Sequence, residues 1–445
     1  MYRVLTNIYQ SKAPLMIVLR YALVGAIILM GIVRLRVTLI LLTSPENFQQ
    51  RDILQIYLMT KALMSGMNPY TALNELASKF VGVFPFFPHP APYPPFVAIL
   101  FIPLLWLNIS NSIIAWYVIE IVCLAMIAYM LTILWKGRLV WFGVIFSFFI
   151  LLAWYPIMAD LGVGQLSILL TLILMAALLA LQRNRRVLAG VLIGLSVAIK
   201  LITWPLIIYL ILKKDWRAVV ASSLTTLGLN LVALFMLGIG PFMDYYLRVS
   251  AQVLEIYHKF WANFSMFTIG YRLFEGTDSA IFEANFHAPP LINLPGLAPV
   301  ASIGLVTTFL AVSMVWAIRS SNVETSFAIL VSLIVAISPI VWDHYFVIII
   351  ISLVVMLHNL VKHSFPATQT LIYFIIVLLV FLFNDRISTV IILLNGGKDL
   401  LQAHGNQITF ASSIISWLPM LEIIILSVLL WRSEISGKQR NYPLT

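Results

Sequence analysis

The sequence predicts an all-α polytopic membrane protein. Of its 445 residues, 62% are hydrophobic and only 10% are charged, and the mean hydropathy is +1.01. Apolar runs of about 18 or more residues recur through most of the chain, and each can cross the ~30 Å hydrocarbon layer as a helix. A transmembrane barrel would instead need short segments of alternating hydrophobicity, and the sequence does not show them.

Twelve apolar segments define a bundle of about 10 to 12 transmembrane segments. They lie at about 15–42, 93–108, 111–134, 139–158, 165–182, 187–212, 216–238, 298–318, 323–341, 343–361, 367–384 and 411–431. A long loop follows the first helix, and the main polar stretches are at 43–92, 239–297 and 385–410. Without a soluble domain or an internal repeat, residues 1–445 are expected to form one integral-membrane domain.

The formal net charge of +10 would suggest nucleic-acid binding in a soluble protein. Here Lys and Arg fall in short clusters between apolar segments, as the positive-inside rule requires of cytoplasmic loops, so we expect no nucleic-acid partner. The single cysteine, Cys123, excludes an intramolecular disulfide. The first apolar run lacks a small-residue cleavage site, and we expect it to remain as an anchor.

The basic clusters orient the chain. If all twelve segments cross, the clusters at 136–138 and 183–186 lie outside, against the positive-inside rule. Two changes remove the conflict. Segment 93–108 would dip into the membrane and return, and segment 187–212 would be a broken, hairpin-like element with Lys200 near its middle, allowed where protein or water covers the free backbone.

Both topologies place the three polar stretches on the outer face of the membrane, where we expect the chemistry. This face collects ionisable and polar residues from distant parts of the chain: Asp52, Asp244, Glu255, His258, Asn263, Arg272, Asp343 and His344. In the topology with the two changes, Asp160 and Gln165 also lie on this face. A solvated loop also collects polar residues for no functional reason, and this alternative stays open.

Asp52 is the candidate around which the other residues are arranged. It lies in the stretch 48–57, just after the first apolar segment, beside Arg51. A carboxylate at the edge of a bilayer is costly unless it is used or solvated, which makes it a functional hypothesis by default. The competing interpretation is an N-cap for the helix-like run that follows it.

Three further basic or imidazole side chains can bind an anion. Lys200 lies inside an apolar segment, where a charge costs about 3 kcal/mol unless it faces a cavity, a counter-charge or a lipid headgroup. His344 follows Asp343 after a Pro-induced break and can donate to a phosphate oxygen, although interfacial packing explains it equally well. Arg272 can bind phosphate bidentately, or it can form a weak surface ion pair.

Two stretches near these residues have plainer explanations. The turn Gly162-Val-Gly164 is too short for a dinucleotide signature, and it predicts a tight turn that leaves Gln165 free to reach a polar ligand. The stretch 84–95, rich in Pro and aromatic residues, predicts a re-entrant connection or a wall beside lipid chains or sugar faces.

The order of these motifs resembles the GT-C membrane glycosyltransferases, and among them family 87 (DUF2029), which includes polyprenyl-phosphate-mannose-dependent mannosyltransferases. The matching stretches span about residues 50–345 and leave 346–445, the C-terminal helices, without family motifs. They are Arg51-Asp52 to Tyr57, Gly66-Met-Asn-Pro-Tyr70, Tyr93-Pro94-Pro95, Gly162 to Gln165, Ala189-Gly190 to Lys200 with Trp204-Pro205, Lys214 to Arg217, Asn263-Phe-Ser265, and Ser338-Pro339 to His344. Ile53 and Phe264 depart from the family pattern.

The resemblance implies a GT-C-like bundle that transfers a hexose, most simply mannose, with inversion from a polyprenyl phosphate to a lipid or glycan hydroxyl. Asp52 would be the general base, and Lys200, Arg272 and His344 would stabilise the leaving phosphate. The other expected substrate-binding residues are Asn263, Gln165, Tyr57 and Asp343. No cofactor or metal is indicated beyond the lipid-linked donor.

The rival hypothesis is a transporter or flippase for a polyprenyl-linked or anionic lipid, since broken helices and a buried lysine are typical of that class. The sequence shows no inverted repeat, and a transporter does not need a carboxylate in a 50-residue outer loop. The transferase is therefore favoured. We expect it in the plasma membrane, with its active site facing outside or the periplasm.

Overall fold

The computed structural model describes residues 14–43, 51–82, 89–134, 141–277, 286–363, 367–382 and 384–441. Its α-helices are α2 (Pro14–Thr43), α3 (Asp52–Met64), α4 (Leu73–Phe80), α5 (Pro95–Leu100), α6 (Ile109–Leu134), α7 (Trp141–Ala153), α8 (Tyr155–Val163), α9 (Ser167–Gln182), α10 (Arg186–Ile199), α11 (Pro205–Leu212), α12 (Trp216–Leu237), α13 (Ile239–Asp244), α14 (Ser250–Tyr257), α15 (Thr268–Phe274), α16 (Ala298–Arg319), α17 (Val323–Ile337), α18 (Ile350–His363), α19 (Ala367–Leu382), α20 (Ile387–Leu394), α21 (Lys398–Ala403), α22 (Phe410–Ile414) and α23 (Leu418–Asn441).

Shorter helical turns connect them. The 3₁₀ turns are η2 (Ile102–Trp106), η3 (Leu201–Thr203), η5 (Pro295–Leu297), η6 (Asp343–Ile349), η7 (Asn384–Arg386) and η8 (Ile415–Trp417), and η4 (Tyr245–Val249) is a π-helix. The described residues contain two isolated β-bridges and no strand. The predicted all-α polytopic membrane fold is confirmed.

In the described residues, fewer helices are long and apolar enough to cross a membrane than there are apolar segments in the sequence. Five helical units in the described part are long and apolar enough to cross a membrane, and the bent pair α7–α8 would make a sixth. Five shorter apolar helices of 10–17 residues accompany them. Since several apolar segments are broken or short, the total of about 10 to 12 spans stays a prediction.

The apolar segment 187–212 is broken, as predicted. Helix α10 ends at Ile199, Lys200 is extended (φ −149°, ψ 111°), and η3 and α11 follow. Arg186 at the start of α10 forms a 3.0 Å ion pair with Asp215 just after α11, so the chain returns to the level at which it entered. Segment 93–108 is likewise two short helices, α5 and η2, and neither can cross.

Helix α12 then runs parallel to α10 with their backbones in close contact. A Cβ added at Gly190 would lie 2.4 Å from the carbonyl oxygen of Ala218, and one at Gly194 would lie 2.4 Å from that of Ser222. Glycines four residues apart are the small-residue pattern that allows such contact between membrane helices. These glycines therefore fix the position of α10 along α12, and with it the position of Lys200 at the end of α10.

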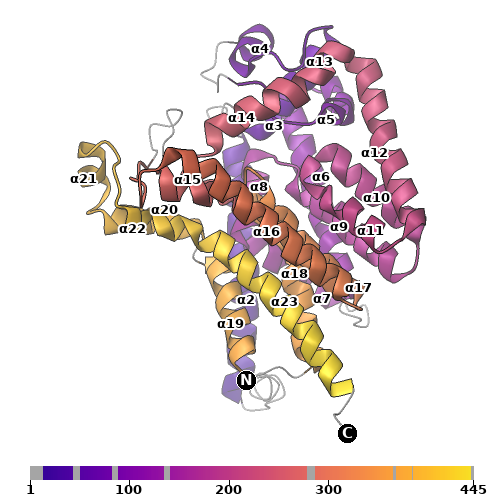
Figure 1. The fold of residues 1–445 in the computed structure, drawn as a ribbon, viewed down its shortest axis with the longest axis vertical. Helices are drawn as coiled ribbons and strands as arrows, with labels where there is room; N and C mark the ends of the chain where they lie inside the picture. Colours follow the sequence, from indigo (N-terminus) through magenta and orange to yellow (C-terminus); the bar gives the residue numbers. More distant parts are fainter. Residues whose placement is uncertain are drawn as a thin grey trace.

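The described parts of the first two predicted outer loops lie at one end of the bundle, with α3, α4, α13 and α14, and the start of α2 and the end of α23 lie toward the other end (Figure 1). The first two loops are joined by a hydrogen bond from Asn68 Nδ2 to Asp244 Oδ2 (2.8 Å) and by one between His89 and the Tyr257 hydroxyl (3.1 Å). His287 pairs with the backbone around Gln407 in the third loop. The predicted convergence of the three loops is therefore present.

Helix α17 forms the centre of the membrane part, since every residue from Thr325 to Ile337 is buried. Helices α16, α18 and α23 pack around it. Some predictions lie outside the described residues, including those for 48–50, for Phe84 to Pro88 of the aromatic stretch, and for the basic cluster 136–138.

Candidate active site

Asp52 is the first residue of α3, and Arg51 occupies the N-cap position. The N-cap interpretation of Asp52 is therefore wrong. One carboxylate oxygen accepts a 2.6 Å hydrogen bond from Gln55 Nε2, one helical turn further on, and the other accepts a hydrogen bond from Gln165 Nε2. The half-buried carboxylate is thus held in one orientation by two amides.

Gln165 reaches Asp52 because of the predicted turn between α8 and α9. Gly164 ends α8 in the left-handed conformation (φ 69°), and a Cβ there would lie 2.8 Å from the Cβ of Ile53. Glycine therefore allows this turn to press against the start of α3. The Gln165 amide also donates to the Tyr93 hydroxyl at 2.9 Å, which fixes which way it points.

Lys200 lies at the break between α10 and η3 and faces the same site. Its ammonium is 3.5 Å from the centre of the Tyr345 ring, a close cation–π contact. The charge of Lys200 also acts on the carboxylates of Asp52 and Asp160. The cost of a half-buried lysine is thus offset by an aromatic face and two acidic side chains.

Burial raises the pKa of Asp52 to about 6, while the Gln165 hydrogen bond and the Lys200 charge act in the opposite direction. A carboxylate with this pKa is mostly ionised at neutral pH and is a much better proton acceptor than an ordinary aspartate. Asp52 therefore has the protonation behaviour that a general base needs.

His344 lies in η6, the 3₁₀ turn that follows the break after α17. Its side chain is buried, its Nε2 atom has no hydrogen-bond partner in the described part of the chain, and the Lys200 charge reaches it. Asp343 is turned toward α8, where its Oδ2 accepts from the Tyr155 hydroxyl at 3.2 Å. Of this pair, His344 is the one positioned with Lys200.

Asn263 is placed differently from what we predicted. Its amide donates to the backbone carbonyls of Tyr257 and Pro339, and its oxygen accepts from the N–H groups of Ser265 and Val341. The bonds to Pro339 and Val341 bind the loop after α14 to the break after α17, and the other two hold the loop itself. Asn263 therefore positions the η6 turn and has no capacity left for a substrate.

Arg272 also serves this loop. Its Nη2 atom donates to the carbonyls of Trp261 and Asn263, both at 2.7 Å, and burial lowers its pKa to about 9. None of its described hydrogen bonds reaches Asp52, Lys200 or His344. Backbone carbonyls therefore occupy Nη2, and a role of Arg272 in binding the donor phosphate stays a prediction.

Tyr57 lies in α3 five residues after Asp52, which is about 140° around the helix from it. Its side chain is half-buried, and burial raises its pKa. It therefore faces away from the amides that hold Asp52.

Two buried carboxyl groups, those of Asp160 and Glu120, lie close to each other near the site. Asp160 in α8 is fully buried and accepts a hydrogen bond from the N–H group of Ser167, and the carboxyl of Glu120 in α6 lies against it. Glu120 was missed in the sequence, although an acidic residue in the middle of an apolar run is itself a signal.

The geometry therefore combines an oriented carboxylate with the charge of Lys200, which also reaches the imidazole of His344. Such a set can take a proton from an attacking hydroxyl while it stabilises an anionic leaving group. In the described part of the chain, no group of three or more His, Cys, Asp or Glu side chains is placed to hold a metal ion.

A model of glycosyltransferase family 87 matches residues 92–339. The chain belongs to this family. It is a multi-pass membrane glycosyltransferase of the GT-C type, and the transporter hypothesis is not supported. The matched region contains Gln165, Lys200 and Asn263, whereas Asp52 lies before it and His344 lies after it.

Among solved structures, the fold is similar to the crystal structure of ArnT from Cupriavidus metallidurans bound to undecaprenyl phosphate. The two share 14% sequence identity with a TM-score of 0.39, over 93% of this chain and 78% of that one. A search of curated proteins found no match.

Proposed function

We propose that this glycosyltransferase moves a hexose, with mannose as the first candidate, from a polyprenyl phosphate to a hydroxyl of a lipid or glycan acceptor. The reaction would proceed with inversion at the outer face of the plasma membrane. The observation that carries the proposal is the placement of Asp52, oriented by Gln55 and Gln165 with Lys200 beside it.

In this mechanism the acceptor oxygen attacks the anomeric carbon as its proton moves to Asp52. The bond from that carbon to the phosphate oxygen breaks, and the electron pair leaves with the polyprenyl phosphate. A singly charged diester becomes a doubly charged monoester, so the leaving group needs added positive charge more than it needs a proton. Lys200 is positioned to supply that charge, and His344 can donate a hydrogen bond to a phosphate oxygen.

The remaining predicted residues take supporting roles. Gln165 orients the base, and Asn263 and Arg272 hold the loop that packs against η6. Asp343 fixes the same turn through Tyr155. We assign the direct substrate contacts to Asp52, Lys200 and His344.

The test uses the purified full chain with radiolabelled polyprenyl-phosphate mannose, glucose or pentose and a lipid acceptor extract. We expect a labelled glycolipid from a hexose donor, with inverted anomeric configuration. Retention of configuration would contradict the single-displacement role of Asp52. Absence of product with every donor would overturn the proposed donor class.

A further inference from the structure

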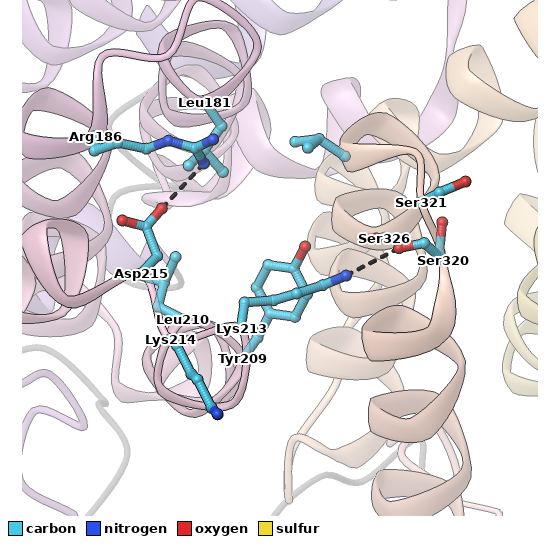
Figure 2. A pocket seen from close by; sticks show the side chains of 11 residues that line it. Leu181, Arg186, Tyr209, Leu210, Lys213, Lys214, Asp215, Ser320, Ser321 and Ser326 are labelled. Carbon is cyan, nitrogen blue, oxygen red and sulfur yellow. Dashed lines mark hydrogen bonds and ion pairs between the residues drawn. The ribbon is translucent and has the colours of Figure 1, made fainter.

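A cavity of about 370 Å³ lies at the end of α10 opposite Lys200. Since α10 has 14 residues, the two ends are about 21 Å apart. This volume is within the range of ligand pockets, about 300–1,000 Å³. The side chains that line it come from α9, the α10–α11 hairpin and the start of α17 (Figure 2): Leu181, Arg186, Tyr209, Leu210, Lys213, Lys214, Asp215, Ser320, Ser321, Val323 and Ser326.

A second cavity of about 280 Å³ shares Arg186 with the first and is also lined by Arg185 and Arg217. The two cavities together present five cationic side chains and one carboxylate. That carboxylate, Asp215, is already paired with Arg186 and accepts from the N–H group of Ala218. Glu434 is nearby, but it lines neither cavity and is held by Ser321.

The first cavity is built from hydrogen-bond donors on two sides. Figure 2 shows the Arg186 guanidinium and the Tyr209 hydroxyl directed toward the gap between the α10–α11 hairpin and α17. Lys213 Nζ donates to the carbonyls of Ile318 and Ser320 at 2.8 and 2.9 Å, which joins the end of α11 to the α16–α17 turn. Guanidinium and hydroxyl donors around a cationic pocket favour a phosphate group.

We propose that these two cavities bind a phosphate group, supplied by the headgroup of an anionic phospholipid or by free phosphate. Topological signals alone explain a basic loop, but they do not explain two adjoining cavities with a shared arginine between them. Basic pockets between membrane helices on the face with the basic loops are typical sites for anionic headgroups.

The two cavities lie at the starts of the helices that lead to Lys200 and His344. Helix α10 runs from Arg186 to the residue before Lys200, and α17 runs from Val323 to the break that precedes His344. An occupant in contact with both helix starts would hold these helices in one relative position. It would therefore link the basic face to Lys200, whose charge acts on Asp52, and to His344.

The test uses the full chain in nanodiscs of phosphatidylcholine, titrated with phosphatidylglycerol, with retained lipid measured by native mass spectrometry. A parallel titration uses inorganic phosphate and thermal unfolding. The triple variant Arg185→Gln, Lys214→Gln and Arg217→Gln removes exposed lining cations. We expect it to weaken phosphatidylglycerol binding by about tenfold or more, because it removes three of the five lining cations.

The control removes three exposed arginines that line neither cavity, in Arg183→Gln, Arg319→Gln and Arg432→Gln. It lowers the net charge equally and should change affinity by less than about threefold. If inorganic phosphate stabilises the unmodified protein and the lining variant loses this stabilisation, the site is supported with free phosphate as its source. If the unmodified protein retains phosphatidylglycerol, the lining variant loses it and inorganic phosphate has no effect, the site is supported with a lipid headgroup as its source. Equal loss in the two triple variants, or no loss in either, would overturn the proposal.

Discussion

Replacing Gln165 with leucine tests how the candidate base is tuned. The Gln165 amide donates to the Asp52 carboxylate and thereby stabilises its ionised form. Leucine has a similar size and no donor, so Gln165→Leu should raise the pKa of Asp52. The acidic limb of the pH profile for kcat/KM, which reports groups of the free enzyme, should move to higher pH.

The size of the movement follows from the hydrogen bond. A net contribution of about 1.5–3 kcal/mol for a bond to a charged group corresponds to about one to two pH units. Because Gln55 and Lys200 remain, we expect the lower end, from about 6 to about 7. At pH 8 the loss from ionisation should be small, and at pH 5 it should approach about tenfold.

The assay is glycosyl transfer from radiolabelled polyprenyl-phosphate mannose between pH 5 and 9. The phosphodiester of this donor keeps its charge throughout that range, so the acidic limb reports the protein. Gln402→Leu, an exposed change in α21, is the matched control and should leave the limb unchanged. An unchanged limb in Gln165→Leu, or a movement to lower pH, would refute the role assigned to Asp52.

Three other changes test the site, the loop and the topology. Lys200→Met should lower kcat by about 10²–10³, the loss typical of one stabilising donor, and Lys200→Arg should restore part of it; a Met variant of normal kcat would exclude Lys200 from the leaving-group site. Asn263→Ala should cost about 2–4 kcal/mol, because it leaves buried backbone groups unpaired, and an unchanged apparent Tm would contradict this role. Arg183→Cys should react with an impermeant maleimide only from the cytoplasmic side and Glu255→Cys only from outside; Cys123 is buried and gives little background, and outside labelling at 183 would defeat the topology.

The membrane class and the broken segment at Lys200 could be predicted because each depends on local composition. An apolar run predicts a helix wherever it lies, and a lysine with a nearby proline inside one predicts a break. The Gly162-Val-Gly164 turn was predicted for the same reason. Sequence could not show that Gln165 touches Asp52, since 113 residues separate them and only the packed helices bring them together.

Two residues predicted to bind substrate have backbone partners instead, for a common physical reason. Asn263 and Arg272 lie in a polar loop, and their residue types are compatible with either a substrate or the backbone as a partner. In the fold, buried backbone groups need hydrogen-bond partners. Asn263 supplies them at the break after α17, and Arg272 supplies them in the loop after α14. The two family motifs around Asn263 and Ser338 therefore bind each other.

The role of Asp52 as general base is tested most directly by Asp52→Asn. Single-turnover transfer from radiolabelled polyprenyl-phosphate mannose should fall by about 10²–10⁴, because the amide keeps the shape of the side chain and cannot take the proton. Donor binding and apparent Tm should stay close to those of the unmodified protein. Turnover of Asp52→Asn at the unmodified rate would contradict the mechanism.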